Sequence, residues 1–360
     1  MSFTANIPLN GVSFGQVSSL LMRGFHKRNL EPCVFPIGQP DLSSQGNDKN
    51  FLDYVSKCTS KAAKEHRRDI PSFKLWHLNG GLDSFSHVHN FLTFYELDQP
   101  TPTELNIAKN VDKLFFTNKY TQNVFEQYGV ESHVVPLAFD SYNFSKINKK
   151  YFDDDRIVFN LCGKFEKRKN HSKTIKAWAK KFGNDKRYSL QCSLYNPFLD
   201  EKRNRDSFIE ALEGQNFFNV QFLGSMPLNK LYNDFLNSGN IIIGMSGAEG
   251  WGLPEFQSVA LGKHAVILNA HAYQEWANSE NSVLVEPSGK IEAYDGVFFH
   301  KGQEFNQGNI FDFNEDDFIS GCEEAIKRVE ENKNNKNGEK LQQDFSLDKT
   351  LDTLLPLINE

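Results

Sequence analysis

Two glycine-containing segments carry charged side chains at points where an apolar run gives way to a helical pattern. In the first, Gly163 is followed by several cations, among them Lys164, Arg168 and Lys169. A glycine at the end of a strand lets the backbone approach a ligand closely, and a helix that starts nearby offers free N–H groups to an anion. Cations at the same place suit a diphosphate. The alternative is a solvated basic turn. A short motif by itself does not decide between the two, because it needs structural context.

The second segment covers residues 246–254 and follows the apolar run 241–243. Its glycines permit tight turns and expose backbone N–H groups, and Pro254 is well placed as the first residue of a helix. Glu249, held in such a loop, can accept hydrogen bonds from sugar hydroxyls. A purely structural turn would not need an acid at this position, although the start of a helix tolerates one.

One histidine has a position suited to chemistry. His77 stands at the end of the run 74–76 and is followed shortly by Gly80 and Gly81. A histidine at a strand end beside two glycines can reach a cleft, and it titrates near neutral pH. The alternative is a structural histidine whose hydrogen bonds are satisfied within the fold.

A basic stripe is predicted on the helix that follows Asp48. Lys57, Lys61, Lys64 and Arg68 follow one another at steps of four, three and four, which places them on one helix face. A solvated face is the simpler interpretation. The functional alternative is an anionic acceptor. That acceptor would be a phospholipid-linked glycan, with peripheral contact to a membrane surface, or a nucleic acid that carries a hydroxylated base.

Short apolar runs alternate with helical patterns along most of the chain, and this alternation predicts mainly parallel sheets covered by helices on both faces. The predicted strands are residues 3–9, 33–37, 73–78, 91–95, 113–117, 133–137, 157–161, 188–194, 220–223, 241–245, 264–269 and 282–286. A tight turn is expected at 11–15, and the predicted helices include 17–27, 51–66, 172–181 and 254–261. The fold class is therefore α/β with two doubly wound halves, and ligands are expected at the carboxyl ends of the strands.

The length of 360 residues exceeds the size at which a single core usually stops growing, so two domains are expected. Residues 1–145 form the first predicted domain and residues 157–340 the second. The linker between them, 146–156, belongs to a polar stretch without periodicity. The apolar tail, 341–360, is expected to form a helix that packs back on the first domain.

Composition narrows the class of protein. A net charge of −6 argues against whole-surface attraction to nucleic acid or anionic lipid. No apolar run approaches the ~20 residues of a membrane-spanning helix, and residues 1–6 do not resemble a signal peptide. Five widely spread cysteines favour reduced thiols in a cytoplasm over disulfides or a zinc site. The acidic run 153–155 is interpreted as solvated charge rather than a metal site.

Residues 249–254, Glu-Gly-Trp-Gly-Leu-Pro, resemble the donor-binding signature of glycosyltransferase family 4, whose members have the GT-B fold. Residues 163–169 resemble that family's diphosphate-binding loop, and residues 134–140 are similar to the segment that ends its N-terminal domain. The resemblance covers about two thirds of the chain and is strongest between residues 91 and 290. Three motifs in the family's order are more specific than any single motif.

The resemblance implies a GT-B architecture, with two Rossmann-like domains facing each other across a cleft. It implies a retaining enzyme, a hexosyltransferase or related, that uses a nucleotide sugar such as a UDP- or GDP-sugar and needs no metal or other cofactor. Lys164 and Lys169 would neutralise the donor diphosphate with Arg168 in support, and Glu249 would hydrogen-bond the donor sugar. The other donor-binding residues that it implies are Gly11, Gly15, Gly163, Met226, Ser246, Gly250, Trp251, Gly252, Leu253, Pro254 and Gln257.

Two positions depart from the family pattern. The family usually has a second glutamate that binds the nucleotide ribose, and this chain has Gln257 there, with Glu255 two residues earlier. An amide oxygen can accept a hydroxyl hydrogen bond but lacks the stronger charge-assisted one. Many relatives also place a histidine at the strand end that faces the acceptor. Glu96 occupies that place here, with a capping or ion-pair role as the alternative.

The leading hypothesis is therefore transfer of a sugar from a nucleoside diphosphate to a hydroxyl of a glycan or lipid-linked glycan. A modified nucleic acid is the less supported acceptor. A second hypothesis, permitted by Gln257, is a sugar-nucleotide-binding protein with little or no transfer activity. A two-domain dehydrogenase is excluded, because no GxGxxG motif follows the first predicted strand. The donor sugar, its base, the acceptor, the linkage and the oligomeric state stay open.

Overall fold

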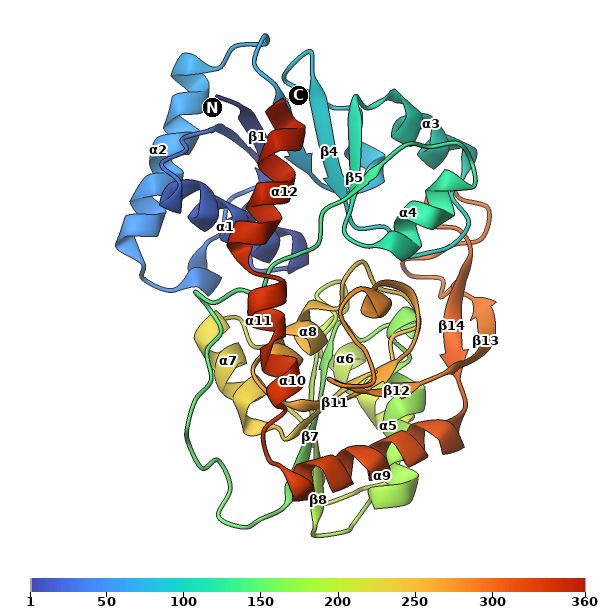
Figure 1. Ribbon diagram of the computed structural model, residues 1–360. Helices are drawn as coiled ribbons and strands as arrows, with labels where there is room; N and C mark the ends of the chain where they lie inside the picture. The colour runs from blue at the N-terminus through green and yellow to red at the C-terminus, as the bar shows by residue number, and fades with distance from the viewer. Residues whose placement is uncertain (1, 360) are drawn as a thin grey trace.

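A computed structural model describes residues 2–359, and two six-stranded parallel sheets dominate it (Figure 1). The first sheet has the order β2-β1-β3-β4-β5-β6. Its strands, in chain order, are β1 (Thr4–Pro8), β2 (Cys33–Ile37), β3 (Ser72–Leu75), β4 (His89–Thr93), β5 (Lys113–Phe116) and β6 (His133–Val134). Its topological switch point lies between β1 and β3, which are hydrogen-bonded neighbours.

The second sheet has the order β12-β11-β10-β7-β8-β9, which is the Rossmann strand order. Its strands are β7 (Ile157–Gly163), β8 (Tyr188–Leu194), β9 (Val220–Phe222), β10 (Ile241–Gly244), β11 (His264–Leu268) and β12 (Val283–Val285). The switch point lies between β7 and β10, where Ile241 pairs with Phe159. The central strands are buried apolar runs, as expected for a parallel sheet covered on both faces.

Helices cover both sheets. Those of the first half are α1 (Ser13–Lys27), α2 (Lys49–Glu65), α3 (Pro102–Asn110) and α4 (Lys119–Glu126), with short 3-10 helices η1 (Ser43–Gln45) and η2 (Leu78–Gly80). Those of the second half are η3 (Lys167–Lys169), α5 (His171–Phe182), α6 (Glu201–Ala211), α7 (Asn229–Ser238), α8 (Leu253–Ala260), η4 (His271–Glu275) and α9 (Glu315–Glu331). Side-chain caps fix several helix starts. Thr101 and Glu104, for example, form a capping box at α3.

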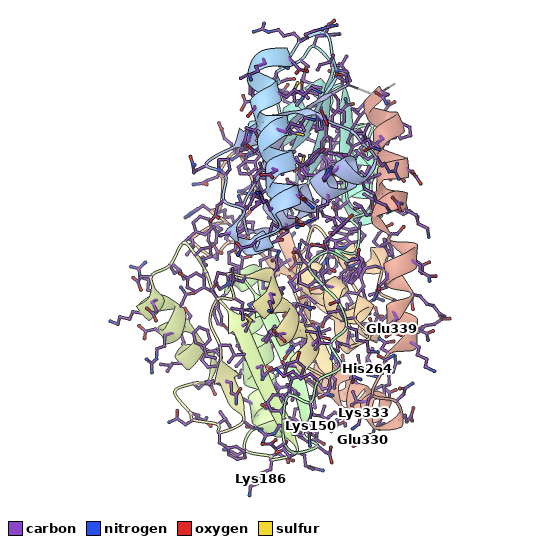
Figure 2. The ribbon with its side chains drawn as sticks, turned by 90° about the vertical axis from the view of Figure 1, so that its left-hand side faces the viewer. Lys150, Lys186, His264, Glu330, Lys333 and Glu339 are labelled. Carbon is purple, nitrogen blue, oxygen red and sulfur yellow. The ribbon has the colours of Figure 1, made fainter. Side chains whose placement is uncertain are left out.

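Two segments connect the halves. Residues 135–156 cross without forming a strand or helix, and Figure 2 shows Lys150 near the end of the second half that lies farthest from the first. The chain returns through α10 (Lys336–Glu339), α11 (Leu341–Asp344) and α12 (Leu347–Asn359). The last of these packs on α1, where Leu351 approaches Gly24 too closely for any larger residue there. Figure 1 shows α12 running along the first half.

The predicted α/β fold with two doubly wound halves is confirmed, and each of the twelve predicted strands forms with both ends within three residues of the prediction. The turn predicted at 11–15 differs, because α1 begins at Ser13 and includes Gly15 in its first turn. The alternation of apolar runs also did not predict the antiparallel hairpin formed by β13 (Pro287–Glu292) and β14 (Asn309–Phe313). It is inserted between β12 and α9 and lies beside both halves in Figure 1.

Candidate active site

The charged motifs of the second half lie on the two sides of its switch point. Lys164 follows β7 and the loop of Glu249 follows β10, and these two strands are neighbours in the sheet. In the first half, Gly11 follows β1 and His77 follows β3, again on the two sides of a switch point. Because parallel strands present their carboxyl ends at one edge, each half offers its candidate residues at one crevice.

Lys169 and Glu249 form a buried ion pair between the Nζ and Oε1 atoms. Their side chains are 9% and 7% exposed. Gly163 has φ of +128°, and the lysine side chain passes close to its Cα, so a glycine suits this turn. Burial lowers the pKa of Lys169, but the nearby carboxylate outweighs burial and raises it. Burial likewise raises the pKa of Glu249, and Lys169 and Arg168 together bring it well below its ordinary value. Both groups are therefore charged at neutral pH.

Arg168 lies at the centre of a buried group of carboxylates. Its Nη2 atom donates to Glu166 at 2.6 Å, and its Nη1 atom lies 3.1 Å from Glu96 and 3.6 Å from Glu249. Nη1 also donates to the carbonyl oxygen of Ala248. The Glu96 contact crosses from the second half to the first. The two terminal nitrogens of Arg168 are thus engaged by protein groups, while its buried Nε atom has no hydrogen-bond partner. Its supporting role toward the diphosphate stays a prediction.

Lys164 is more accessible than Arg168 and Lys169. Its side chain is 31% exposed, its Nζ atom lies 3.0 Å from Glu166, and the ring of Phe298 lies 4.1 Å away. Lys164, Arg168 and Lys169 therefore each have a carboxylate partner in this structure. A bound diphosphate would have to exchange with at least one of these partners, and the partner of Lys169 is the candidate sugar ligand, Glu249.

The loop after β10 is held between the two halves. A Cβ atom at Gly250 would lie 2.7 Å from Cβ of Phe94, so glycine is needed for the halves to meet here. The carbonyl oxygen of Gly250 accepts hydrogen bonds from the Thr117 hydroxyl and, at 3.0 Å, from the Asn118 amide. Gly252 has φ of +79° and packs on Tyr273. The loop conformation is thus fixed by its glycines and by contacts with the first half.

The other implied donor residues differ in accessibility. Trp251 is buried and packs against Phe256 and Phe345, so its ring belongs to the core. Ser246 is buried, and its hydroxyl donates to Ala248 O at 3.1 Å. Residues that keep partial exposure are Met226, Leu253 and Pro254. Leu253 and Pro254 begin α8, as the sequence predicts for the proline.

Gln257, the position that departs from the family pattern, contacts the segment that connects the halves. Its Oε1 atom accepts from the backbone N–H of Asp140 at 3.4 Å, and its side chain is buried. Glu255 does not replace it, because Glu255 is buried beneath the loop beside Gly244 and Tyr273. Gln257 has an amide in place of a carboxylate, and the carboxylate of Glu255 is buried. Neither side chain therefore presents a charged acceptor at the surface of the crevice.

Glu255 leads to a prediction about pH. Burial raises the pKa of its carboxyl to about 7, and the charge of Lys169 only partly opposes this. In the unfolded chain the carboxyl of a glutamate has a pKa of about 4.3. The folded state therefore loses stability as the pH rises from about 4.3 towards 7, where the unfolded chain has released a proton that the folded one retains. Glu255→Gln should raise the midpoint of thermal unfolding, relative to the unsubstituted protein, more at pH 8 than at pH 5. An equal difference at both pH values would contradict this account.

The first half contributes an aromatic wall. The ring of Phe14 stacks on Phe94 at 4.1 Å and lies 4.4 Å from the ring of His77. His77 keeps an exposed surface, yet the surrounding protein desolvates its ring and, with the charge of Lys164, lowers its pKa to about 4. It is therefore neutral at pH 7. Burial raises the pKa of Glu96, against the opposing charge of Arg168.

The two predicted glycines of the first half behave differently. Gly11 is exposed in the loop after β1. Gly15 is buried in α1, where a Cβ atom would lie 2.2 Å from the carbonyl oxygen of Asn10. A glycine is therefore needed here because the loop before α1 leaves no room for a side chain. Only the backbone of Gly15 could make the predicted approach to a donor.

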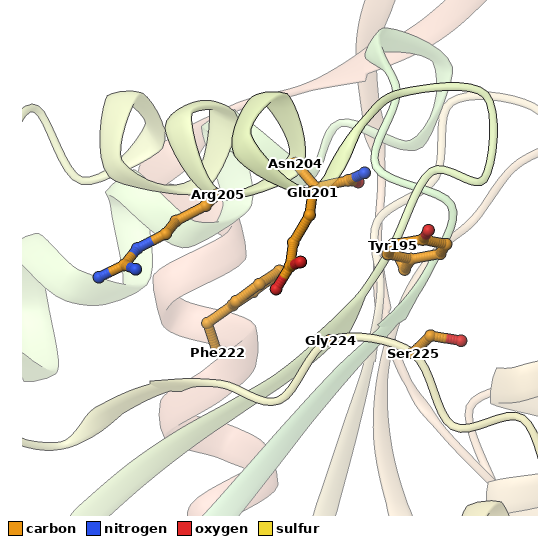
Figure 3. A pocket seen from close by; sticks show the side chains of 7 residues that line it. All are labelled: Tyr195, Glu201, Asn204, Arg205, Phe222, Gly224 and Ser225. Atoms are coloured by element: carbon orange, nitrogen blue, oxygen red, sulfur yellow. The ribbon is translucent and has the colours of Figure 1, made fainter.

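A cavity of about 460 Å³ adjoins the cationic loop, at the carboxyl ends of β8 and β9 (Figure 3). Its volume falls in the range of small-molecule sites. The backbone N–H of Tyr195, one of its walls, donates to Gly163 O at 3.2 Å, which places the cavity beside the motif. The residues that line it are Tyr195, Glu201, Asn204, Arg205, Phe222, Gly224 and Ser225, and the patterns in the sequence did not indicate them.

The basic stripe on α2 is partly neutralised. Lys57 forms an ion pair with Glu31 at 2.5 Å, and Lys61 donates to the carbonyl oxygen of the same residue at 2.8 Å. Lys64 is exposed on α2. Arg68 is also exposed but lies outside the helix, because the backbone becomes extended at His66 and α2 ends at Glu65, so the prediction that Arg68 shares this helix face is wrong. The sequence could not indicate the pairing, since Glu31 precedes the helix and meets it only in the folded chain. Within residues 2–359, no cluster of three or more potential ligands is placed to hold a metal ion, and no helix could span a membrane.

The residues that sequence reasoning missed at this site are Glu166, Thr117 and Asn118. Glu166 is buried beside Arg168 within the recognised motif, and a carboxylate between two cations was the available signal. Thr117 ends a predicted strand and Asn118 follows it, and asparagine before a helix indicates a cap. Their second role, at the loop of Gly250, required the fold.

No family model matches the sequence, and no curated protein matches it either. Solved structures do match. A sucrose-phosphate synthase from Thermosynechococcus elongatus is 14% identical with a TM-score of 0.68, over 99% of this chain and 98% of that one. A glycosyltransferase from Rickettsia africae is 13% identical with a TM-score of 0.67, over 99% and 97%. Anabaena HepE in complex with UDP-glucose is 13% identical with a TM-score of 0.67, over 99% of each chain. The chain therefore has the GT-B architecture that the sequence resemblance implied.

Proposed function

We propose that the protein is a retaining glycosyltransferase of family 4 type that moves a sugar from a nucleoside-diphosphate sugar to an acceptor hydroxyl. The observation that carries the proposal is the pairing of Lys169 with Glu249 across the switch point of the second half. A cation for a diphosphate and a carboxylate for a sugar are thereby brought together at the place where such folds bind ligands. The resemblance to solved glycosyltransferases adds support.

Donor binding is an exchange of partners in this proposal. A diphosphate that binds Lys169 releases Glu249, and the freed carboxylate can then accept hydrogen bonds from the hydroxyls of the donor sugar. Lys164, which is more exposed than Lys169, meets the diphosphate first. The nucleoside would lie in the cavity beside Tyr195, which adjoins this loop.

Transfer then needs charge stabilisation more than acid catalysis by the protein. The bond between the anomeric carbon and the donor phosphate oxygen breaks, and the acceptor oxygen bonds to that carbon on the same face. The acceptor proton passes to a donor phosphate oxygen, and the nucleoside diphosphate leaves. Lys164 and Lys169 stabilise the charge that develops on it. Because these fixed cations can do so, the proposal includes independence from metals and other cofactors, which activity in EDTA would test.

The acceptor is proposed to bind between the halves, near Glu96 and His77. A glycan or a lipid-linked glycan is the proposed acceptor class, at a cytoplasmic site with peripheral contact to a membrane. A hydroxylated nucleobase is the second acceptor class. Because His77 is neutral, it can donate a hydrogen bond to an acceptor hydroxyl or accept one from it. It carries no positive charge that would draw the diphosphate away from the lysines.

The alternative is a sugar-nucleotide-binding protein with little or no transfer activity. Two observations favour it. Lys164, Arg168 and Lys169 each already have a carboxylate partner, and Gln257 is engaged by Asp140 rather than free for a ribose. Such a protein would bind a nucleotide without turning over its sugar.

A donor screen separates the two functions. Thermal stabilisation by UDP-, GDP- and ADP-sugars at equal concentration ranks donors, because a ligand that binds more tightly stabilises the folded state more. Release of the nucleoside diphosphate from the preferred donor, with water or a simple sugar as acceptor, then reports turnover. Stabilisation together with release supports the enzyme, whereas stabilisation without release from any donor supports the binding protein. The absence of both would contradict both assignments.

A further inference from the structure

The hairpin β13–β14 belongs by sequence to the second half but completes the core of the first. Ala293, Phe299 and Ile310 are buried, at 0%, 5% and 0% exposure. They pack in one apolar cluster with Phe91 and Ile107 of the first half. Figure 1 shows the hairpin below α3 and α4, at the side of the molecule away from α7. It therefore ties the halves together in addition to the two connecting segments.

Asp98 attaches both strands of the hairpin to the segment after β4. Its carboxylate accepts from the Nζ atom of Lys290 at 2.8 Å and from the backbone N–H of Asn309 at 2.7 Å. The side chain of Asp98 is only 11% exposed. A Cβ atom at Gly308, which has φ of +125°, would lie 2.4 Å from the Oδ1 atom of Asp98. The hairpin backbone is thus shaped to receive this carboxylate.

A second attachment lies at the start of α3. The Glu104 carboxylate accepts from the backbone N–H of Asn306 at 2.9 Å, and the Thr101 hydroxyl donates to Glu304 O at 2.6 Å. Glu104 is 1% exposed. These contacts hold the connection between β13 and β14 to the first half, so Asp98 is not the sole tie and its loss need not unfold the protein.

The same hairpin also contacts the cationic loop. The Nζ atom of Lys167 donates to the carbonyl oxygens of Glu292 and Tyr294 at 2.8 and 2.9 Å, and the ring of Phe298 lies beside Lys164. The hairpin therefore contacts the cationic loop of the second half and, through Asp98, the segment of the first half that carries Glu96. These are the two segments joined by the 3.1 Å contact between Arg168 and Glu96.

We propose that the hairpin is a brace between the halves and that Asp98 is a positioning residue, which holds Glu96 against Arg168 on the acceptor side of the cleft. The inference rests on the proposed function only in that Glu96 faces the acceptor. Asp98 does not contact the donor cations, so its role is separate from donor binding.

Asp98→Ala tests the brace, with Asp98→Asn as the conservative variant, since an amide oxygen can still accept from Asn309. Glu292→Gln is the matched control. It breaks the exposed Glu292–Lys301 pair, also 2.7 Å long, which lies within the hairpin and does not join the halves. Asp98→Ala should lower kcat/KM for the acceptor by about tenfold, because small misplacements in a site reduce rates steeply. Asp98→Asn should lose less, Glu292→Gln less than about twofold, and none should change nucleotide affinity.

A distance measurement tests the brace without relying on transfer activity. All five native cysteines are buried, so spin labels at Lys109→Cys on α3 and Lys180→Cys on α5, both exposed positions, report the separation of the halves. The distance distribution should widen in Asp98→Ala, widen less in Asp98→Asn, and stay unchanged in Glu292→Gln. Unchanged distributions in both Asp98 variants would overturn the proposal. If no nucleotide binds, the proposed function fails, while this measurement still decides whether the brace exists.

Discussion

Replacing Lys169 by methionine is expected to reduce sugar transfer by at least about tenfold, because it removes a preorganised cation from the site where leaving-group charge develops. The measurement is the rate of nucleoside diphosphate release at saturating donor, for the donor that the thermal screen ranks first. Lys176→Met is the matched control, since Lys176 forms an exposed pair with Glu213 at 2.6 Å in the same half. It should change the rate little.

Stability must be separated from activity in this variant. Loss of Lys169 leaves the carboxylate of Glu249 buried, with Arg168 as the cation that stays beside it. Removing one partner of a buried ion pair generally costs roughly 3–5 kcal/mol of stability. The double variant Lys169→Met, Glu249→Gln removes both charges and should recover much of that stability. Transfer should stay low in the double variant. Recovery of transfer along with stability would show that Lys169 serves the fold rather than the reaction.

Glu249→Gln is expected to have opposite effects on transfer and on nucleotide binding. Transfer should fall by at least about tenfold, since the charged acceptor for the sugar hydroxyls is lost. The free nucleoside diphosphate should bind more tightly, by about tenfold or more, because Lys169 no longer has to give up a charge-assisted hydrogen bond with Glu249, and such a bond contributes about 1.5–3 kcal/mol. Calorimetric titration with UDP or GDP measures the second effect.

The control for Glu249→Gln is Glu213→Gln, the other half of the exposed pair with Lys176. It should alter neither transfer nor nucleotide affinity. Weaker nucleotide binding in Glu249→Gln would contradict the exchange of partners at Lys169. Unchanged transfer in both Glu249→Gln and Lys169→Met would remove these residues from the proposed reaction.

The strands were predictable because their signal is local. Apolar runs such as 241–243 and 188–194 have to be buried on both faces, and such burial leaves a pattern within a few residues. The placement of Lys164 and Glu249 at neighbouring strand ends was predictable for the same reason, since a glycine-rich turn after a strand marks its carboxyl end. The α/β alternation then constrained the architecture to few possibilities.

The hairpin was not predictable from such patterns. Its strands are partly exposed, and its apolar residues Ala293, Phe299 and Ile310 are buried against residues about 200 positions earlier in the chain. No local periodicity records a contact of that kind. Its attachment through Asp98 depends on a backbone position, Gly308, whose meaning is visible only when both halves are present.

The partners of the charged residues were likewise hidden. Sequence motifs indicated that Lys164, Arg168 and Lys169 carry positive charge at a ligand site, but not that carboxylates already hold each of them. The basic stripe on α2 shows the same limit, because Glu31 neutralises part of it from outside the helix. Charge is a property of a residue, whereas its availability to a ligand depends on every group packed around it.

The sequence by itself determined the two doubly wound halves and the strand ends at which Lys169 and Glu249 stand, because both follow from local patterns of apolar residues and glycines. Only the tertiary structure decided that these two side chains pair with each other, that Arg168 reaches Glu96 in the other half, and that the hairpin braces the contact. The physical reason is that ion pairs and buried contacts depend on distances in space, which close only when segments far apart in the chain pack together.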